Sequence, residues 1–322
     1  MTIKALLSFL FLSLSLHAID LAQLYQTQGM ESVEKQLDMT LETKEYWDTY
    51  LKDKNVTYGL FNSYNELLFC NKREGNLTRF SITENHTVKP KYNLETLIGG
   101  GNGDKQYEGD LKTPVGVYNL NGRIDNPDPF YGPLALVTNY PNKYDLAQDK
   151  NGSGIWIHGK PEKGPREDYT KGCLVIENDE LLALDKSIDR FKTALVISPS
   201  TFPKTNQDTV ATVLANLFQW RNHWKHSDLK SYLSFYSPSF KRSNGMSLTQ
   251  FSAIKKNIFR NKIKRRINFY HINVIPYPNA DGKKLFYVNL TEQYDAGHIH
   301  FNGKKELYLE LIDDKIFILT EN

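Results

Sequence analysis

The sequence predicts an α+β fold built from several parts, because its hydrophobic pattern changes twice along 322 residues. Apolar residues recur at helical spacing near the N-terminus, and short apolar runs separated by turn residues fill the middle. Near the C-terminus helical stripes come first and alternating strands follow, which is typical of α+β domains. With 40% hydrophobic and 24% charged residues, the composition is that of a globular protein. A formal charge of +3 is too small to indicate nucleic-acid binding.

Residues 1–18 have the pattern of a secretory signal peptide. Lys4 gives a positive start, residues 5–16 are an apolar run, and Leu16-His17-Ala18 resembles a cleavage site. The run is too short to span a bilayer comfortably, so we expect export without stable membrane insertion after the signal is removed. An uncleaved N-terminal anchor is the alternative.

Residues 19–55 are predicted to form a helical segment. Val33, Leu37, Leu41 and Trp47 form an apolar stripe, and Gly29 separates two short helices. The segment cannot bury this stripe by itself. It either packs on the next domain or pairs with a second copy of the chain.

Residues 56–198 are predicted to form a mostly-β domain. A glycine-rich stretch at residues 98–104 lacks the Gly-Lys-Ser/Thr ending of a phosphate-binding loop, so it is interpreted as a mobile turn. Strands are expected at residues 58–61, 66–70, 115–120, 134–138 and 194–197, and one helix is expected at 178–191.

Residues 199–208 are predicted to be a linker, and residues 209–322 an α+β cone. The cone begins with a helical stripe at 210–224, followed by helices near 228 and at 254–263. Strands at 285–294 and 307–319 follow, the second with a turn at Asp313-Asp314. A basic run at 255–266 is typical of a solvated helix face, with contact to an anionic polymer as the alternative.

The chemistry of the chain is predicted to lie in Ile157-His158-Gly159 and Thr170-Lys171-Gly172-Cys173. A cysteine attacks as its thiolate and needs a nearby base at neutral pH, which His158 would supply. The N–H groups of Gly172 and Cys173 would face a developing oxyanion. The non-catalytic alternative, for a lone cysteine and a lone histidine, is that Cys173 is an inert buried thiol and His158 a core histidine.

These motifs resemble those of the L,D-transpeptidase (YkuD) family. The family pattern is a histidine, a spacer of about fifteen residues and then Ser/Thr-x-Gly-Cys, and residues 109–118 and Tyr140-Pro141-Asn142 also match. The resemblance covers roughly residues 56–198. Lys171 stands where most members have a second histidine, so His158 is the only base in the motif. Residues 218–221 and 232–236 are similar to NTF2-like domains attached to some family members.

The resemblance implies a periplasmic enzyme without cofactor that acts on peptidoglycan stem peptides. The three-part layout most resembles L,D-carboxypeptidases that set cell shape. Such an enzyme removes the terminal D-Ala from a tetrapeptide through a cysteine thioester, and its N-terminal segment, here residues 19–55, forms a homodimer. An L,D-transpeptidase that makes cross-links or attaches proteins, and an inactive wall-binding scaffold, are the alternatives.

Five further residues are candidates for substrate binding: Trp156, Gly159, Arg166, Thr170 and Lys171. Trp156 would form a wall of the pocket or else a core contact, and Thr170 would hydrogen-bond the turn or orient the base. Lys171 would stabilise the thiolate, attract a substrate carboxylate or simply be solvated, and Arg166 would bind a substrate carboxylate.

Two other features are expected to carry no chemistry. Cys70, in a predicted strand, is interpreted as a small hydrophobe rather than a disulfide partner. His298 and His300 lack a third ligand at metal-binding spacing, so no metal is expected.

Overall fold

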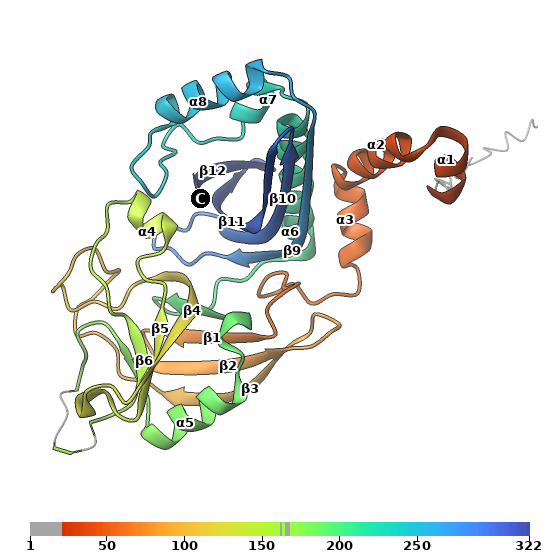
Figure 1. Cartoon of the computed structure of the whole chain (residues 1–322). Coiled ribbons are helices and arrows are strands. Elements are labelled where there is room, and N and C mark those ends of the chain that lie inside the picture. The colour runs from red at the N-terminus through yellow and green to blue at the C-terminus, as the bar shows by residue number, and fades with distance from the viewer. Residues whose placement is uncertain (1–20, 162, 165–167) are drawn as a thin grey trace, which may run out of the picture. The chain divides into compact units, whose positions relative to one another are not determined.

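A computed structural model describes residues 21–161, 163–164 and 168–322 and divides the chain into two compact units, residues 1–40 and 41–322 (Figure 1). In the first unit the described residues form α1 (Leu21–Gln28) and most of α2 (Met30–Leu41). Gly29 lies between them with a φ of 78°, a conformation that favours glycine, so the predicted break is confirmed. The predicted signal peptide, residues 1–18, lies outside the described residues.

The short helix α3 (Lys44–Leu51) packs on the long helix α6 (Gln207–Lys225) of the second unit. Thr43 caps α3 by accepting a hydrogen bond from the Tyr46 N–H. Trp47 is buried, and its ring centroid lies 5.3 Å from that of Phe218 on α6. Trp47 therefore packs on another part of the same chain, which is one of the two alternatives stated for the apolar stripe.

An eight-stranded sheet forms the middle of the chain, with the strand order β3-β2-β1-β8-β4-β5-β6-β7. Strands β1 and β8 are buried along most of their length because they lie inside the sheet, and their continuous apolar runs reflect this. The strands are β1 (Glu66–Asn71), β2 (Asn76–Ile82), β3 (Val88–Glu95), β4 (Gly116–Asp125), β5 (Leu134–Thr138), β6 (Trp156–His158), β7 (Leu174–Val175) and β8 (Thr193–Ser198). The accompanying helices are η1 (Pro129–Tyr131), α4 (Lys143–Ala147), α5 (Asn178–Ser187) and η2 (Arg190–Lys192).

Two expectations for this region need correction. Leu60, in the strand predicted at 58–61, makes an isolated β-bridge with Val274 instead of joining a strand. The glycine-rich stretch expected to be a mobile turn is paired on both sides, since Gly99 bridges Thr170 and Gly101 bridges Lys112. A Cβ on Gly99 would lie 2.3 Å from the Leu111 carbonyl oxygen, so glycine permits this close approach.

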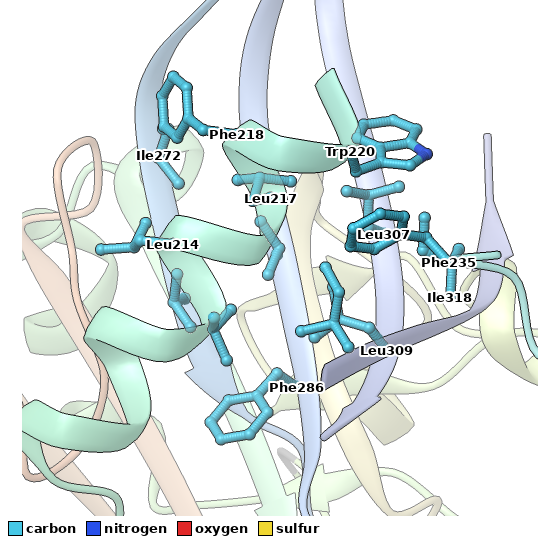
Figure 2. Packing of buried hydrophobic residues seen from close by; sticks show 14 of the residues in the cluster. Leu214, Leu217, Phe218, Trp220, Phe235, Ile272, Phe286, Leu307, Leu309 and Ile318 are labelled. Carbon is cyan, nitrogen blue, oxygen red and sulfur yellow. The ribbon is translucent and has the colours of Figure 1, made fainter. Parts of the chain in front are cut away.

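The C-terminal part is a four-stranded antiparallel sheet curled around α6. Figure 2 shows Leu214, Leu217 and Trp220 of α6 in one cluster with Leu307, Leu309 and Ile318 of the sheet. This packing forms a hydrophobic core of its own. The elements besides α6 are α7 (Leu229–Leu233), α8 (Leu248–Arg260), β9 (Arg265–Pro276), β10 (Leu285–Ala296), β11 (Ile299–Ile312) and β12 (Lys315–Glu321).

The predicted turn at Asp313-Asp314 is confirmed, and both residues have positive φ. Helix α8 ends at Arg260, before the predicted end at 263, because Asn261 caps it and Lys262 takes a φ of 42°. Strand β9 was not predicted. Its pairing with β10 shifts register near His271, which has a φ of 51°, and this irregularity interrupts the alternation expected of a strand.

A further cluster of buried side chains lies between the two sheets. Phe69 and Val117 of the first sheet lie in one cluster with Tyr287 and Tyr308 of the second sheet and with Tyr277, which directly follows β9. Polar groups in this layer are paired across it: the Asn289 side-chain amide donates to the Tyr64 hydroxyl at 2.6 Å. The Asn142 amide likewise donates to the Tyr277 hydroxyl at 3.2 Å. The two β-regions are therefore joined by a packed interface.

Candidate active site

His158 and Cys173 meet because β6 and β7 are neighbouring parallel strands. His158 is the last residue of β6 and pairs in register with Val175 of β7, while Cys173 immediately precedes β7. Both residues line one cavity of about 540 Å³. The two sequence-predicted catalytic side chains are thus brought into the same cavity.

The orientation of the His158 ring is fixed from two sides. Its Nδ1 lies 2.8 Å from the carbonyl oxygen of Gly159, and since a carbonyl only accepts, Nδ1 carries the proton. The Tyr131 ring stands perpendicular to the imidazole, with centroids 5.0 Å apart. With Nδ1 protonated, a neutral His158 has its basic lone pair on Nε2.

Cys173 is half-buried, and its thiol donates to the carbonyl oxygen of Gly154 at 3.2 Å. The turn before it is built around Gly172, which has a φ of 132°. A Cβ there would lie 2.7 Å from the Lys112 carbonyl oxygen, so any larger residue would displace the turn. The position therefore requires glycine.

Thr170 organises this turn through its hydroxyl. The hydroxyl accepts from the Gly172 N–H at 2.9 Å and donates to the Cys173 carbonyl at 2.7 Å. In this conformation the Gly172 N–H, which was expected to face an oxyanion, is bound to Thr170, and its role at an oxyanion stays a prediction. Thr113 adds a third bond by donating to the Gly172 carbonyl at 3.0 Å.

The remaining predicted residues fall into different places. Trp156 and Lys171 line the cavity, and Trp156 contacts the Tyr131 ring at a centroid distance of 5.1 Å. Gly159 does not line the cavity; it serves through its carbonyl on His158. Arg166 lies outside the described residues.

Sequence reasoning missed the aromatic lining of the cavity and its charged wall. Phe130, Tyr131 and Tyr169 line the cavity, and no spacing pattern in the sequence pointed to them. Lys105 and Glu108 also line it, on the loop that precedes β4.

The Asp110 carboxylate fixes the conformation of that loop. Its carboxylate binds the Lys105 ammonium at 2.7 Å and accepts from the N–H groups of Gln106, Tyr107 and Lys112. Burial opposes ionisation of Asp110, but Lys105 and these N–H groups outweigh it and lower the pKa of the carboxyl to about 2. The segment at 109–118 was recognised as a family motif, and this loop clamp gives a physical reason for its aspartate.

The other sites considered from sequence show different surroundings. Cys70 is fully buried on β1, both cysteines are free thiols, and burial raises the pKa of the Cys70 thiol to about 12. His300 Nδ1 lies 2.7 Å from the Asp295 carboxylate. Within residues 21–161, 163–164 and 168–322, no three potential metal-binding side chains come together.

Two known protein families match the two β-rich parts of the chain separately. Residues 65–197 match the L,D-transpeptidase catalytic domain (YkuD), and residues 212–322 match the Cds6 C-terminal NTF2-like domain. The crystal structure of the helical cell shape determining protein Pgp2 from Campylobacter jejuni is 35% identical, with a TM-score of 0.81. That alignment covers 87% of this chain and 99% of Pgp2. This chain belongs to the L,D-transpeptidase (YkuD) family.

Two further relatives agree with this family membership. Bd1075 of Bdellovibrio bacteriovorus is 25% identical with a TM-score of 0.63, over 82% of this chain and 97% of Bd1075. The putative L,D-transpeptidase YafK of Escherichia coli K12 is 40% identical over 60 residues, which are 19% of this chain. The chain spans about a quarter, 24%, of the length of this curated relative.

Because the chain belongs to the L,D-transpeptidase family, it is an enzyme of a family that acts on peptidoglycan. Enzymes of this family act on peptidoglycan stem peptides, which places them outside the cytoplasm. In the part of the chain that the structure describes, no helix has the length and apolar character needed to cross a bilayer.

Proposed function

We propose that this protein is a peptidoglycan L,D-carboxypeptidase that removes the terminal D-Ala from stem tetrapeptides. The observation that carries the proposal is the pair of His158 and Cys173 in one cavity, with the His158 Nδ1 proton held by the Gly159 carbonyl. This arrangement leaves Nε2 as the base for a thiol. The bond cleaved joins the L-centre of a diamino acid at position three to D-Ala at position four.

The reaction runs through a thioester. His158 Nε2 takes the Cys173 proton, and the sulfur attacks the carbonyl carbon of the position-three residue. When the tetrahedral intermediate collapses, the C–N bond breaks and the D-Ala nitrogen takes the proton from His158. Water then attacks the thioester, His158 takes a proton from that water and returns it to the sulfur, and a tripeptide with a new carboxylate is released.

The oxyanion of the intermediate needs hydrogen-bond donors. We assign the Cys173 N–H to it. The Gly172 N–H could serve as well only by leaving the Thr170 hydroxyl, which it contacts at 2.9 Å. Thr170 is therefore proposed to shape the turn rather than to touch the substrate.

Substrate is held by the cavity walls in this proposal. Lys171 is exposed on the turn beside Cys173 and lines the cavity, where its ammonium would attract the D-Ala carboxylate. Trp156 and Tyr131 supply an apolar wall for the peptide. Arg166 stays a second candidate for carboxylate binding.

The preference for hydrolysis over cross-linking rests on similarity to Pgp2, a helical cell shape determining protein, along nearly its whole length. We extend the proposal to cell-wall trimming that affects cell shape. We also propose a periplasmic protein released from a signal peptide at residues 1–18. The further parts are a helical segment at 19–55 that forms a homodimer, a catalytic domain at 56–198, a linker at 199–208 and an NTF2-like domain at 209–322.

One experiment tests the reaction and its acceptor together. The mature protein is incubated with purified tetrapeptide muropeptides in ¹⁸O-labelled water, and the products are resolved by mass. Hydrolysis gives tripeptide with one ¹⁸O in the new carboxylate and free D-Ala. Unlabelled cross-linked dimers would identify a transpeptidase instead. No product with either acceptor, or full turnover by Cys173→Ala, would refute the covalent mechanism.

A further inference from the structure

One end of the C-terminal cone combines exposed cations with exposed apolar side chains. Residues 248–271 contain seven Lys or Arg residues and no Asp or Glu. Two of the seven, Lys255 and Arg265, face inward, and the other five are exposed. We call this surface the basic tip; its members are Lys256, Arg260, Lys262, Lys264, Arg266, Ile258, Ile263, Ile299 and Phe301.

Arg265 joins the parts of the basic tip into one surface. Its buried guanidinium donates to the carbonyl oxygen of Ile258 at 2.9 Å and lies over the Phe259 ring. The same residue pairs with Ala296 in the β9–β10 ladder, next to the turn at Gly297. A Cβ on Gly297 would lie 3.7 Å from the Ile263 side chain. The end of α8, the loop after it and the β10–β11 turn are thus fixed against one another.

The apolar members of the tip face water in this chain. Ile258 is 41% exposed, Ile263 39%, Ile299 51% and Phe301 47%. The inward face of α8 is already supplied by Phe251 and Phe259, which are buried, so Ile258 is not needed for the core. Single exposed apolar residues need no explanation, but a group of them among cations points to a contact surface.

We propose that the basic tip binds the surface of an anionic phospholipid bilayer. Cations gain attraction from the headgroups, and apolar side chains enter the boundary between headgroups and acyl chains. A second copy of the tip would be repelled by its own charge. A soluble polyanion would neutralise the cations but would leave the isoleucines and Phe301 in water. A bilayer surface satisfies both components.

This contact goes beyond the proposed activity, because none of its residues lines the catalytic cavity. It would hold the enzyme peripherally at a membrane while the cavity acts on the wall. Lipid binding and muropeptide turnover can therefore succeed or fail independently.

The test is co-sedimentation of the full mature chain with vesicles. Wild type should bind vesicles of phosphatidylcholine mixed with phosphatidylglycerol and not vesicles of phosphatidylcholine alone. The triple variant Lys256→Gln, Arg260→Gln, Lys262→Gln should bind the mixed vesicles about a hundredfold more weakly. A control with the same loss of charge, Lys204→Gln, Lys283→Gln, Lys284→Gln, should bind like wild type. The double variant Ile263→Ser, Ile299→Ser should bind about tenfold more weakly.

The thermal unfolding midpoint of each variant is measured as a control. A midpoint equal to that of the wild type shows that the variant keeps its fold. The proposal is overturned if wild type ignores the mixed vesicles, or if it binds neutral vesicles equally well. It is also overturned if the two triple variants lose equal affinity. Equal retention of wild type and the isoleucine variant on immobilised polyglutamate, with no vesicle binding, would identify a soluble acidic partner instead.

Discussion

The hydroxyl of Thr170 donates a 2.7 Å hydrogen bond to the carbonyl oxygen of Cys173 while it accepts from the Gly172 N–H. One side chain thereby fixes the backbone on both sides of the nucleophile's turn. A hydroxyl can make both bonds because its oxygen donates one hydrogen bond and accepts others.

Thr170→Val should therefore lower both stability and activity. The change keeps the shape of the side chain but leaves two buried backbone groups without their partner, at a cost of about 1–3 kcal/mol in the free energy of unfolding. Thr170→Ser should retain most of both properties. Urea unfolding and muropeptide turnover measure the effect; a valine variant with wild-type turnover would show that the turn needs no such support.

The two cysteines should differ sharply in reactivity. At neutral pH a thiol reagent should modify one cysteine per folded chain, because Cys70 is fully buried and its thiol pKa is raised to about 12. Cys173→Ala should abolish labelling, and Cys70→Ala should leave both labelling and turnover near wild type. Two labelled sites in the native protein, or a large loss of activity in Cys70→Ala, would contradict this assignment.

His158 and Cys173 should behave as one unit in kinetics. His158→Ala removes the base, and the thiol then attacks poorly, so the double variant with Cys173→Ala should be hardly slower than either single variant. Losses that multiply instead would show that the two side chains act independently.

Asp110 should make stability depend on pH in the acid range. Its folded-state pKa of about 2 lies below the ordinary value of 3.8, so its contribution is complete above about pH 5. The contribution is lost as pH falls through 2. After allowance for solvent screening, we expect Asp110→Asn to cost about 1 kcal/mol at pH 6. The gap between wild type and variant in urea unfolding should close near pH 2; a gap that stays constant would assign the loss to packing.

The proposed homodimer should depend on α1 and α2 but not on α3. Trp47 of α3 packs on Phe218, so deleting α3 would damage the core of the same chain. A deletion of residues 21–40 should give a folded monomer in light scattering, while the intact mature chain should be a dimer. Trp47→Ala is the matched comparison: it should cost about 3–5 kcal/mol of stability and leave the folded fraction dimeric. A monomeric wild type would refute the dimer.

Local patterns in the sequence were enough to predict most of the individual elements. The apolar run at 66–70, the helical stripe of α6 and the turn at Asp313-Asp314 were recognised because each follows its own period. The chemistry of Cys173 and His158 was recognised because the motif carries it. Tyr131 and Lys105 were missed because they reach the cavity only through the fold, from a 3₁₀ turn and a loop distant from Cys173 in sequence.

The errors have physical causes as well. Strand β9 was missed because the bulge at His271 breaks its alternation and its first residues are basic. The partner of Trp47 stayed open between another domain and a second copy, because periodicity shows that a residue lies on an apolar face but not what covers it. The hydrogen bond from the Gly172 N–H to the Thr170 hydroxyl is a further feature that no spacing rule reveals.

The layer of tyrosines and asparagines between the two sheets also determines how this protein can be divided. Tyr277, Tyr287 and Tyr308 come from the C-terminal part, yet they share a buried cluster with Val117 of the catalytic region, and the Tyr277 hydroxyl accepts a hydrogen bond from the Asn142 amide. Cutting the chain between β8 and α6 would expose this buried layer to solvent on both halves. The catalytic region is consequently not an independent folding unit. It and the NTF2-like domain should melt in a single calorimetric transition. A fusion that transfers either one to another protein needs to include the residues of the other that cover this layer.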